Sequence, residues 1–280
     1  MVTVSKKWNI IQWRCITMKK KVFIFLFIFL IIIIGIGVII FNKPSRQNID
    51  IPILLYHDFV LQVPNSDPDN FNYINTPESF EENIKTLLEN GYTFLSFKEL
   101  NDALHNKKKL PKKPILITLD DGYYSNYKYI FPILKKYSVK ASIFIVTDNI
   151  GKTVNGKKYL TWQQCKSMQD SDLVEIFSHS TRHVFYDKLS VSELRNDVKK
   201  SYKEIEKYLG KQELKVFAYP YGAYTKESVL VLKLNGIDMQ VYDIGINNFK
   251  TFNKSYIKRI NIPCEMTGKE IIQEMNSINY

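Results

Sequence analysis

The chain has 280 residues, with 39 lysines and arginines against 28 aspartates and glutamates, which gives a formal net charge of +11. Six basic residues and no acidic residue precede Asn42, so taking six from +11 leaves residues 42–280 at +5. This mild charge is scattered without interleaved aromatic residues, which argues against a nucleic-acid-binding protein and is compatible with loose attraction to an anionic cell envelope.

The first predicted element is the run 22–41, which contains only apolar side chains and two glycines. As a helix it would span about 30 Å, the thickness of a membrane's hydrocarbon core. Lys19–Lys21 precede it, so the positive-inside rule predicts a cytoplasmic basic N-terminus over residues 1–21 and an extracytoplasmic remainder. We expect a transmembrane anchor, with a cleaved signal segment and a secreted protein as the alternative. Met18 is an alternative start of the chain.

Residues 42–50 are polar and contain a proline, as a short stem does, and residues 51–280 are long enough for one α/β domain. Short runs rich in β-branched and aromatic residues indicate strands in this domain. They are Ile51–Tyr56, Tyr92–Leu95, Pro114–Leu119, Ala141–Val146, Leu173–Phe177, Lys215–Ala218, Asp238–Tyr242 and Tyr256–Ile262. Cys165 and Cys264 stand in no metal-site or redox spacing, and we expect both to be unpaired, buried thiols, with one bridge between them as the alternative.

Helices are indicated between these strands by side chains that can accept hydrogen bonds from free backbone N–H groups. Thr76 precedes Pro77 and an apolar pattern of helical spacing that Gly91 ends. Capping boxes stand at Ser96/Glu99, Thr161/Gln164, Ser190/Glu193 and Thr267/Glu270. The alternation of strands and helices predicts a mainly parallel sheet, either open and doubly wound or closed into a barrel. In both, ligand sites lie at the carboxyl ends of the strands.

Four motifs directly follow four of these strands, where ligand sites are expected. They are Tyr56-His57-Asp58, Asp120-Asp121-Gly122, Ser178-His179-Ser180-Thr181-Arg182-His183 and Tyr219-Pro220-Tyr221-Gly222. Two adjacent carboxylates at the end of an apolar strand resist desolvation, and a bound cation would offset that cost. Two imidazoles four residues apart, with one carboxylate, suit a divalent transition metal. A capping aspartate and solvated histidines are the plainer alternatives.

The other two motifs also have a chemical and a plain interpretation. His57 ends an apolar strand and should point into the same mouth, where a histidine can protonate a leaving amine near neutral pH. Its alternative is a hydrogen bond to a loop. The turn Tyr219–Gly222 can present backbone N–H groups to a developing oxyanion, or it can simply connect a strand to a helix.

Taken together, the motifs resemble those of the NodB-type polysaccharide deacetylases, carbohydrate esterase family 4. The resemblance is carried by Thr118–Gly122, the histidine pair, Tyr219–Gly222, Tyr56-His57, Phe131–Tyr137 and Leu160–Gln164. It covers nearly the whole domain, and within the family it is closest to the poly-β-1,6-N-acetyl-D-glucosamine N-deacetylases of biofilm formation. The loop Val60–Asn75 is long for a compact domain, so its Phe71 and Tyr73 either line a sugar groove or belong to a solvated excursion.

The resemblance implies the fold and the cofactor. The fold is an α/β structure, a distorted (β/α) barrel of about seven strands, here preceded by the transmembrane or signal segment. The cofactor is one divalent transition metal ion, namely zinc, cobalt or nickel. Carried over residue by residue, its ligands are Asp121, His179 and His183.

The resemblance also implies how the chemistry is divided. Asp120 becomes the base that takes the proton of the attacking water, and His57 the acid that protonates the departing amine. Pro220 and Tyr221 bind the substrate, with the Tyr221 N–H at the oxyanion. Most of the wider family has an arginine two residues before the proline, where this chain has Ala218. The biofilm-polymer branch also lacks it, so the residue that orients the base is left unassigned.

The implied function is removal of N-acetyl groups from a surface poly-N-acetylglucosamine by an extracytoplasmic protein, held at the membrane by residues 22–41 or secreted. Deacetylation of another glycan, such as peptidoglycan, chitin oligomers or xylan, is the alternative within the enzyme class. An inactive glycan-binding module is the alternative from a different class. A binder needs no base beside a metal, so the retained Asp120 argues against the module.

Overall fold

The computed structural model describes residues 25, 29, 46–63 and 73–278. The chain divides into two compact units, Met1–Arg46 and Gln47–Tyr280. Apart from Phe25 and Phe29, the predicted basic N-terminus and transmembrane segment lie outside the described residues, as do Phe71 and part of the stem. Among the helices formed by the described residues, none is long and apolar enough to cross a membrane.

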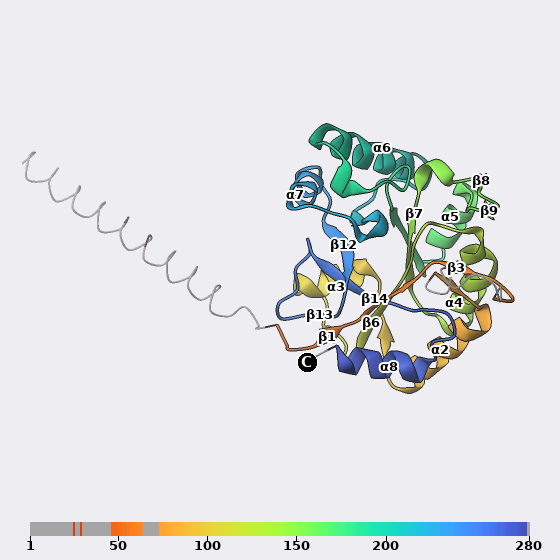
Figure 1. The fold of residues 1–280 in the computed structure, drawn as a ribbon. Helices are drawn as coiled ribbons and strands as arrows, with labels where there is room; N and C mark the ends of the chain where they lie inside the picture. The colour runs from red at the N-terminus through yellow and green to blue at the C-terminus, as the bar shows by residue number, and fades with distance from the viewer. Residues whose placement is uncertain (1–24, 26–28, 30–45, 64–72, 279–280) are drawn as a thin grey trace, which may run out of the picture. The chain divides into compact units, whose positions relative to one another are not determined.

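The second unit contains a closed barrel of parallel strands, coloured from orange through green to blue in Figure 1. In spatial order the strands are β2 (Ile53–Tyr56), β14 (Ile257–Asn261), β12 (Met239–Ile244), β11 (Val216–Ala218), β10 (Val174–Ser178), β7 (Ala141–Ile145) and β6 (Pro114–Leu119). The barrel closes because β6 pairs with β2 in parallel, from Ile53 opposite Leu116 to Tyr56 opposite Leu119. An eighth strand, β5 (Thr93–Phe94), pairs with the first residues of β6. Of the two predicted alternatives, an open doubly wound sheet and a closed barrel, the structure has the closed barrel, which confirms the expected barrel of about seven strands.

Helices surround this barrel. They are α2 (Pro77–Glu89), α3 (Phe97–Leu104), α4 (Phe131–Tyr137), α5 (Trp162–Gln169), α6 (Val191–Leu209), α7 (Lys226–Leu234) and α8 (Gly268–Ser277). Five of them, α2, α3, α5, α6 and α8, begin after the capping side chains predicted from the sequence. All four predicted capping boxes form. A fifth, Thr225 with Ser228 at the start of α7, was not predicted because serine replaces the usual glutamate or glutamine.

Shorter elements complete the connections between strands and helices. Three pairs of short strands are β1 (Asp50–Ile51) with β13 (Asn247–Asn248), β3 (Asp58–Phe59) with β4 (Ile74–Asn75), and β8 (Thr153–Val154) with β9 (Lys157–Lys158). The short helical segments are η2 (Asn126–Ile130), η3 (Thr147–Asn149), η4 (Tyr186–Lys188) and η5 (Pro220–Gly222). Cys165 and Cys264 are both buried, and neither is in a disulfide.

The core has two parts, one between barrel and helices and one inside the barrel. The inner cluster takes buried side chains from all seven barrel strands, which can meet only in the barrel interior. Phe144 and Phe177 lie there with their rings 5.7 Å apart, and Phe97 of α3 contacts both from below the strands' amino ends. Side chains alternate along a strand, so the positions two residues further on share this interior. At the carboxyl ends of β6, β10 and β14 those positions are polar.

Candidate active site

The polar end of the barrel is built by the same two-residue alternation that builds its apolar plug. On β6, buried Leu116 is followed by Thr118 and then by Asp120, just beyond the strand. On β10, Phe177 is followed by His179, and on β14 Ile257 is followed by Arg259. Asp120, His179 and Arg259 are each only 2–3% exposed. The predicted motifs from separate strands therefore converge on one site, placed directly on the hydrophobic core.

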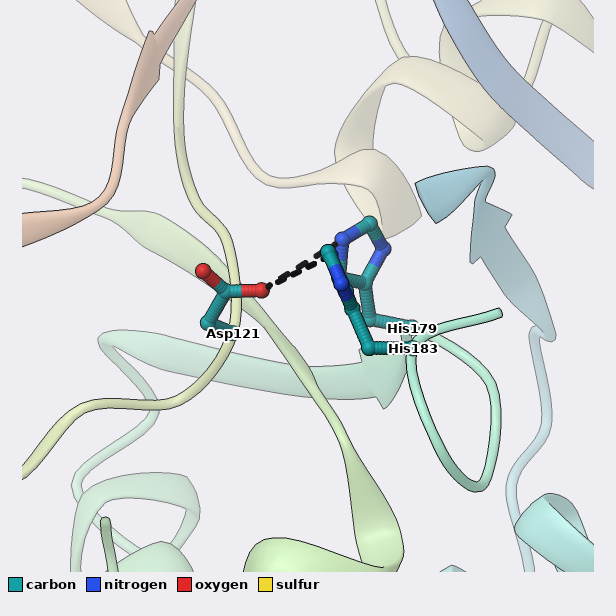
Figure 2. A group of neighbouring side chains, drawn as sticks. All are labelled: Asp121, His179 and His183. Carbon is teal, nitrogen blue, oxygen red and sulfur yellow. Dashed lines mark ion pairs between the residues drawn. The ribbon is translucent and has the colours of Figure 1, made fainter. Parts of the chain in front are cut away.

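Asp121, His179 and His183 form a compact cluster at this end of the barrel. Figure 2 shows the three side chains pointing toward one another. The carboxylate oxygen Oδ1 of Asp121 lies 3.6 Å from Nε2 of His179 and 3.2 Å from Nε2 of His183. One ligand atom from each residue fits within 4.8 Å of the others. In a tetrahedral zinc site, bonds of about 2.1 Å separate ligand atoms by roughly 3.4 Å, so the observed spacing matches a metal site.

The hydrogen bond on the far side of His179 supports the same interpretation. Its Nδ1 lies 2.8 Å from the Ala218 carbonyl oxygen, which can only accept, so Nδ1 carries a proton and Nε2 is the nitrogen left to face a metal. Metal-binding histidines are commonly held in this way. Burial lowers the pKa of His183, and the neighbouring His179 lowers it further, which favours the neutral form that ligates metals.

The loop that carries both histidines is held by side-chain bonds rather than by a helix. Ser180 and His183 have positive φ angles of 72° and 56°, a conformation unfavourable for residues with side chains. The His183 N–H donates to Ser180 Oγ at 2.8 Å. Buried Asp197 on α6 accepts from the Thr181 N–H at 3.0 Å, from the Thr181 hydroxyl, and from the Tyr186 hydroxyl at 2.6 Å. Asp197 thus ties the histidine loop to a long helix.

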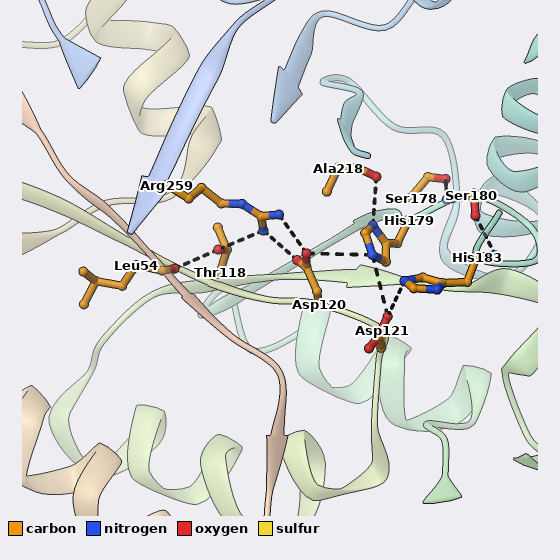
Figure 3. Close-up of polar contacts among 10 residues, drawn as sticks. All are labelled: Leu54, Thr118, Asp120, Asp121, Ser178, His179, Ser180, His183, Ala218 and Arg259. Carbon is orange, nitrogen blue, oxygen red and sulfur yellow. Dashed lines mark hydrogen bonds and ion pairs between the residues drawn. The ribbon is translucent and has the colours of Figure 1, made fainter. Parts of the chain in front are cut away.

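Asp120 is held by an arginine that the sequence did not point to. Arg259 donates from Nη1 to Oδ1 at 2.7 Å and from Nη2 to Oδ2 at 2.8 Å, and both side chains are 3% exposed (Figure 3). Nη1 also lies 3.3 Å from the Thr118 hydroxyl. Burial alone would raise the pKa of Asp120, but Arg259 and His179 outweigh it and hold that pKa well below its usual range.

The arginine that orients Asp120 therefore lies on a different strand from Ala218, which ends β11. Arg259 comes from β14, which pairs with β12 and β2 and is separated from β11 by β12. Its neighbour Lys258 is exposed, whereas Arg259 is buried. Arg259 lies two residues after buried Ile257, so the two side chains share a face of the strand, and this was the signal in the sequence. Ile260 and Ile262 are also buried, but they lie on the opposite face. The pattern alone did not show which side faced inward.

The remaining predicted residues border this centre. Burial lowers the pKa of His57, against the opposing effect of Asp120 and Asp121. Its buried Nδ1 has no hydrogen-bond partner among the residues that the structure describes. Tyr73 packs edge-on against the His57 ring at 5.0 Å. Pro220 is buried, and Tyr221 at φ 59° turns its ring to within 4.4 Å of the His183 ring. The structure thus brings all the predicted site residues to one end of the barrel.

Fold and site together define a class, namely closed (β/α) barrels with a candidate Asp-His-His metal site at their strand ends. Residues 107–240 match the family model described as polysaccharide deacetylase. The matched segment, residues 107–240, is therefore a polysaccharide deacetylase domain, as the motifs predicted.

Individual relatives and solved structures agree with this assignment. The Bacillus subtilis protein YxkH is 33% identical over 71% of this chain and 65% of its own. The poly-β-1,6-N-acetyl-D-glucosamine N-deacetylase of Staphylococcus epidermidis is 32% identical over 59% and 60%. The chain thus spans about 60–65% of the length of these relatives. The Streptococcus pyogenes deacetylase PplD has a TM-score of 0.72 at 26% identity, covering 82% of this chain and 99% of that one.

Proposed function

We propose that the protein is a metal-dependent polysaccharide N-deacetylase that acts on surface poly-β-1,6-N-acetyl-D-glucosamine. The observation that carries the proposal is the Asp121, His179 and His183 cluster beside a carboxylate, Asp120, that an arginine keeps ionised. The choice of polymer is supported by the name of the Staphylococcus epidermidis relative. We further propose an extracytoplasmic location, with residues 22–41 as membrane anchor or signal segment.

Asp121, His179 and His183 would hold the metal. Two imidazoles and a carboxylate suit zinc, cobalt or nickel alike. When bound, such an ion polarises the acetamide carbonyl and lowers the pKa of water. The chain itself supplies three ligands that already lie close together. It also supplies a hydrogen bond from His179 Nδ1 to the Ala218 carbonyl, which leaves Nε2 to face the metal.

Asp120 serves as the base in this proposal. Both its oxygens accept from Arg259, so the carboxylate keeps one orientation and stays ionised. It takes the proton of the water that attacks the acetamide carbon. Arg259 positions Asp120 without touching the substrate. It thus takes the orienting role that the sequence left unassigned, because Ala218 stands where most of the family has an arginine.

His57 serves as the acid that protonates the departing amine. Because burial lowers its pKa, His57 is neutral at pH 7 and must first gain a proton. Asp120 and Asp121 oppose the effect of burial on that pKa without outweighing it. Tyr221, which lies in a left-handed turn, would offer its backbone N–H to the developing oxyanion.

Acetate release tests the proposal. The purified full chain should release acetate and create free amines on poly-N-acetylglucosamine faster than on peptidoglycan, chitin oligomers or xylan. Faster release from one of those polymers would reassign the substrate. Tight polymer binding that a chelator does not affect, without acetate release from any of them, would instead indicate a binding module.

A further inference from the structure

Two aromatic side chains next to the candidate metal site leave much of their surface in solvent. Phe185 is 48% exposed and Tyr221 is 59% exposed. Their rings stack with centroids 4.0 Å apart and planes inclined by 10°. Tyr221 also contacts the ring of His183 at 4.4 Å. A half-exposed pair adds little to the core, and exposed apolar surface at the rim of a polar site commonly contacts a ligand.

The chain holds this aromatic pair in place before any ligand binds. Tyr186, the residue after Phe185, is fully buried, donates its hydroxyl to Asp197 at 2.6 Å and packs on Phe217 at 4.8 Å. Phe185 is therefore fixed at the surface by an anchored neighbour. Tyr221 is held in a left-handed conformation, φ 59° and ψ 10°, that bulky residues rarely adopt. A ligand would lose little by ordering these rings, because they are already ordered.

We infer that Phe185 and Tyr221 form a subsite for the pyranose ring next to the unit that is deacetylated. The inference rests on the proposed function. A pyranose has C–H groups on its faces and hydroxyl groups around its edge, so a flat aromatic surface binds its face while the edge stays in water. Tyr221 covers one face of the Phe185 ring, and the Phe185 side chain is still 48% exposed and accessible to such contact. Since Tyr221 touches His183, a chain with its acetamide at the metal site continues over Phe185.

A second stacked pair on the outer wall supplies a matched control. Trp162 and Tyr208 stack at 4.6 Å and 13°, and Tyr208 is 42% exposed. They line a groove between α4, α5 and the end of α6 that contains none of the predicted catalytic or metal-binding residues. Tyr208 therefore resembles Phe185 in exposure and stacking but not in location.

Phe185→Ala in the full chain tests the subsite, with Tyr208→Ala as control. We expect the KM for acetate release from β-1,6-linked N-acetylglucosamine oligomers to rise about tenfold in Phe185→Ala, for the loss of one aromatic contact, while kcat stays within about twofold. Hydrolysis of an aryl acetate, which has no sugar, should not change, and Phe185→Trp should keep the wild-type KM. An unchanged oligomer KM, or an equal loss on the aryl acetate, would overturn the inference.

Equilibrium binding separates this inference from the proposed function. Oligomer affinity is measured on chelator-treated wild type and Phe185→Ala, where no turnover occurs. If wild type releases no acetate but Phe185→Ala weakens binding about tenfold, the proposed function fails and the subsite stands. If acetate is released normally and the two affinities are equal, the subsite fails and the proposed function stands. Absence of oligomer binding to wild type would contradict the subsite as well.

Discussion

Replacing Arg259 by methionine should both destabilise the protein and disable Asp120. Arg259 and Asp120 form a two-point ion pair with each side chain 3% exposed, so little solvent screens the charge left behind. Removing one partner of a buried pair costs about 3–5 kcal/mol. For a domain of this size that lowers the Tm by roughly 6–20 °C. Without Arg259, burial should raise the pKa of Asp120, and activity should be lost at a higher pH on acidification than in wild type.

The assay combines thermal unfolding with the pH profile of acetate release, with Lys258→Met as control. Lys258 is the exposed neighbour of Arg259, so its loss should change stability by less than about 0.5 kcal/mol. The double variant Asp120→Asn, Arg259→Met should be more stable than Arg259→Met alone, because no unpaired buried charge remains. A wild-type Tm and pH profile in Arg259→Met would refute the reasoning.

Three further predictions concern the metal ligands, the histidine loop and pH. Asp121→Asn or His179→Ala should lower bound metal and acetate release by more than about 100-fold with the circular dichroism spectrum unchanged; retained activity would contradict the ligand assignment. Asp197→Asn should weaken metal affinity by about 10–100-fold, measured by chelator competition, and an unchanged affinity would show that the loop does not need this anchor. Burial lowers the pKa of His57, so below about pH 6.5 the unfolded chain binds more protons than the folded one. Urea unfolding of metal-free protein should therefore show that the free energy of unfolding falls from about pH 7.5 to 5.5, and falls less in His57→Gln. An increase in that free energy on acidification would contradict this prediction.

Much of the fold followed from local signals in the sequence. Strands such as Pro114–Leu119 are continuous apolar runs because a barrel buries both faces, and the structure has that strand at the same bounds. Helix starts followed from residues such as Ser96, whose oxygen accepts from the Glu99 N–H as predicted. Closure of the barrel was different, because the pairing of β6 with β2 joins segments about 60 residues apart and no local pattern encodes it.

Some residues of the candidate site could likewise be predicted from the sequence, and others could not. Asp121 and His179 were found because polar residues directly after apolar strands are visible in the sequence. Arg259 was missed because its role depends on which face of β14 turns inward. The anchoring of the histidine loop by Asp197 was also missed, because a single aspartate within a polar helical surface carries no distinguishing pattern. Residues at strand ends could be predicted from the sequence alone, whereas contacts across the barrel could be identified only from the structure.

Metal-dependent release of acetate from poly-N-acetylglucosamine is the most direct test of the central claim. The purified full chain should release acetate, lose that activity after a chelator removes its metal, and regain it when zinc, cobalt or nickel is restored. Bound metal should fall and recover in parallel, at about one ion per chain for a single three-residue site. Acetate release that continues unchanged in chelated, metal-free protein would contradict the account.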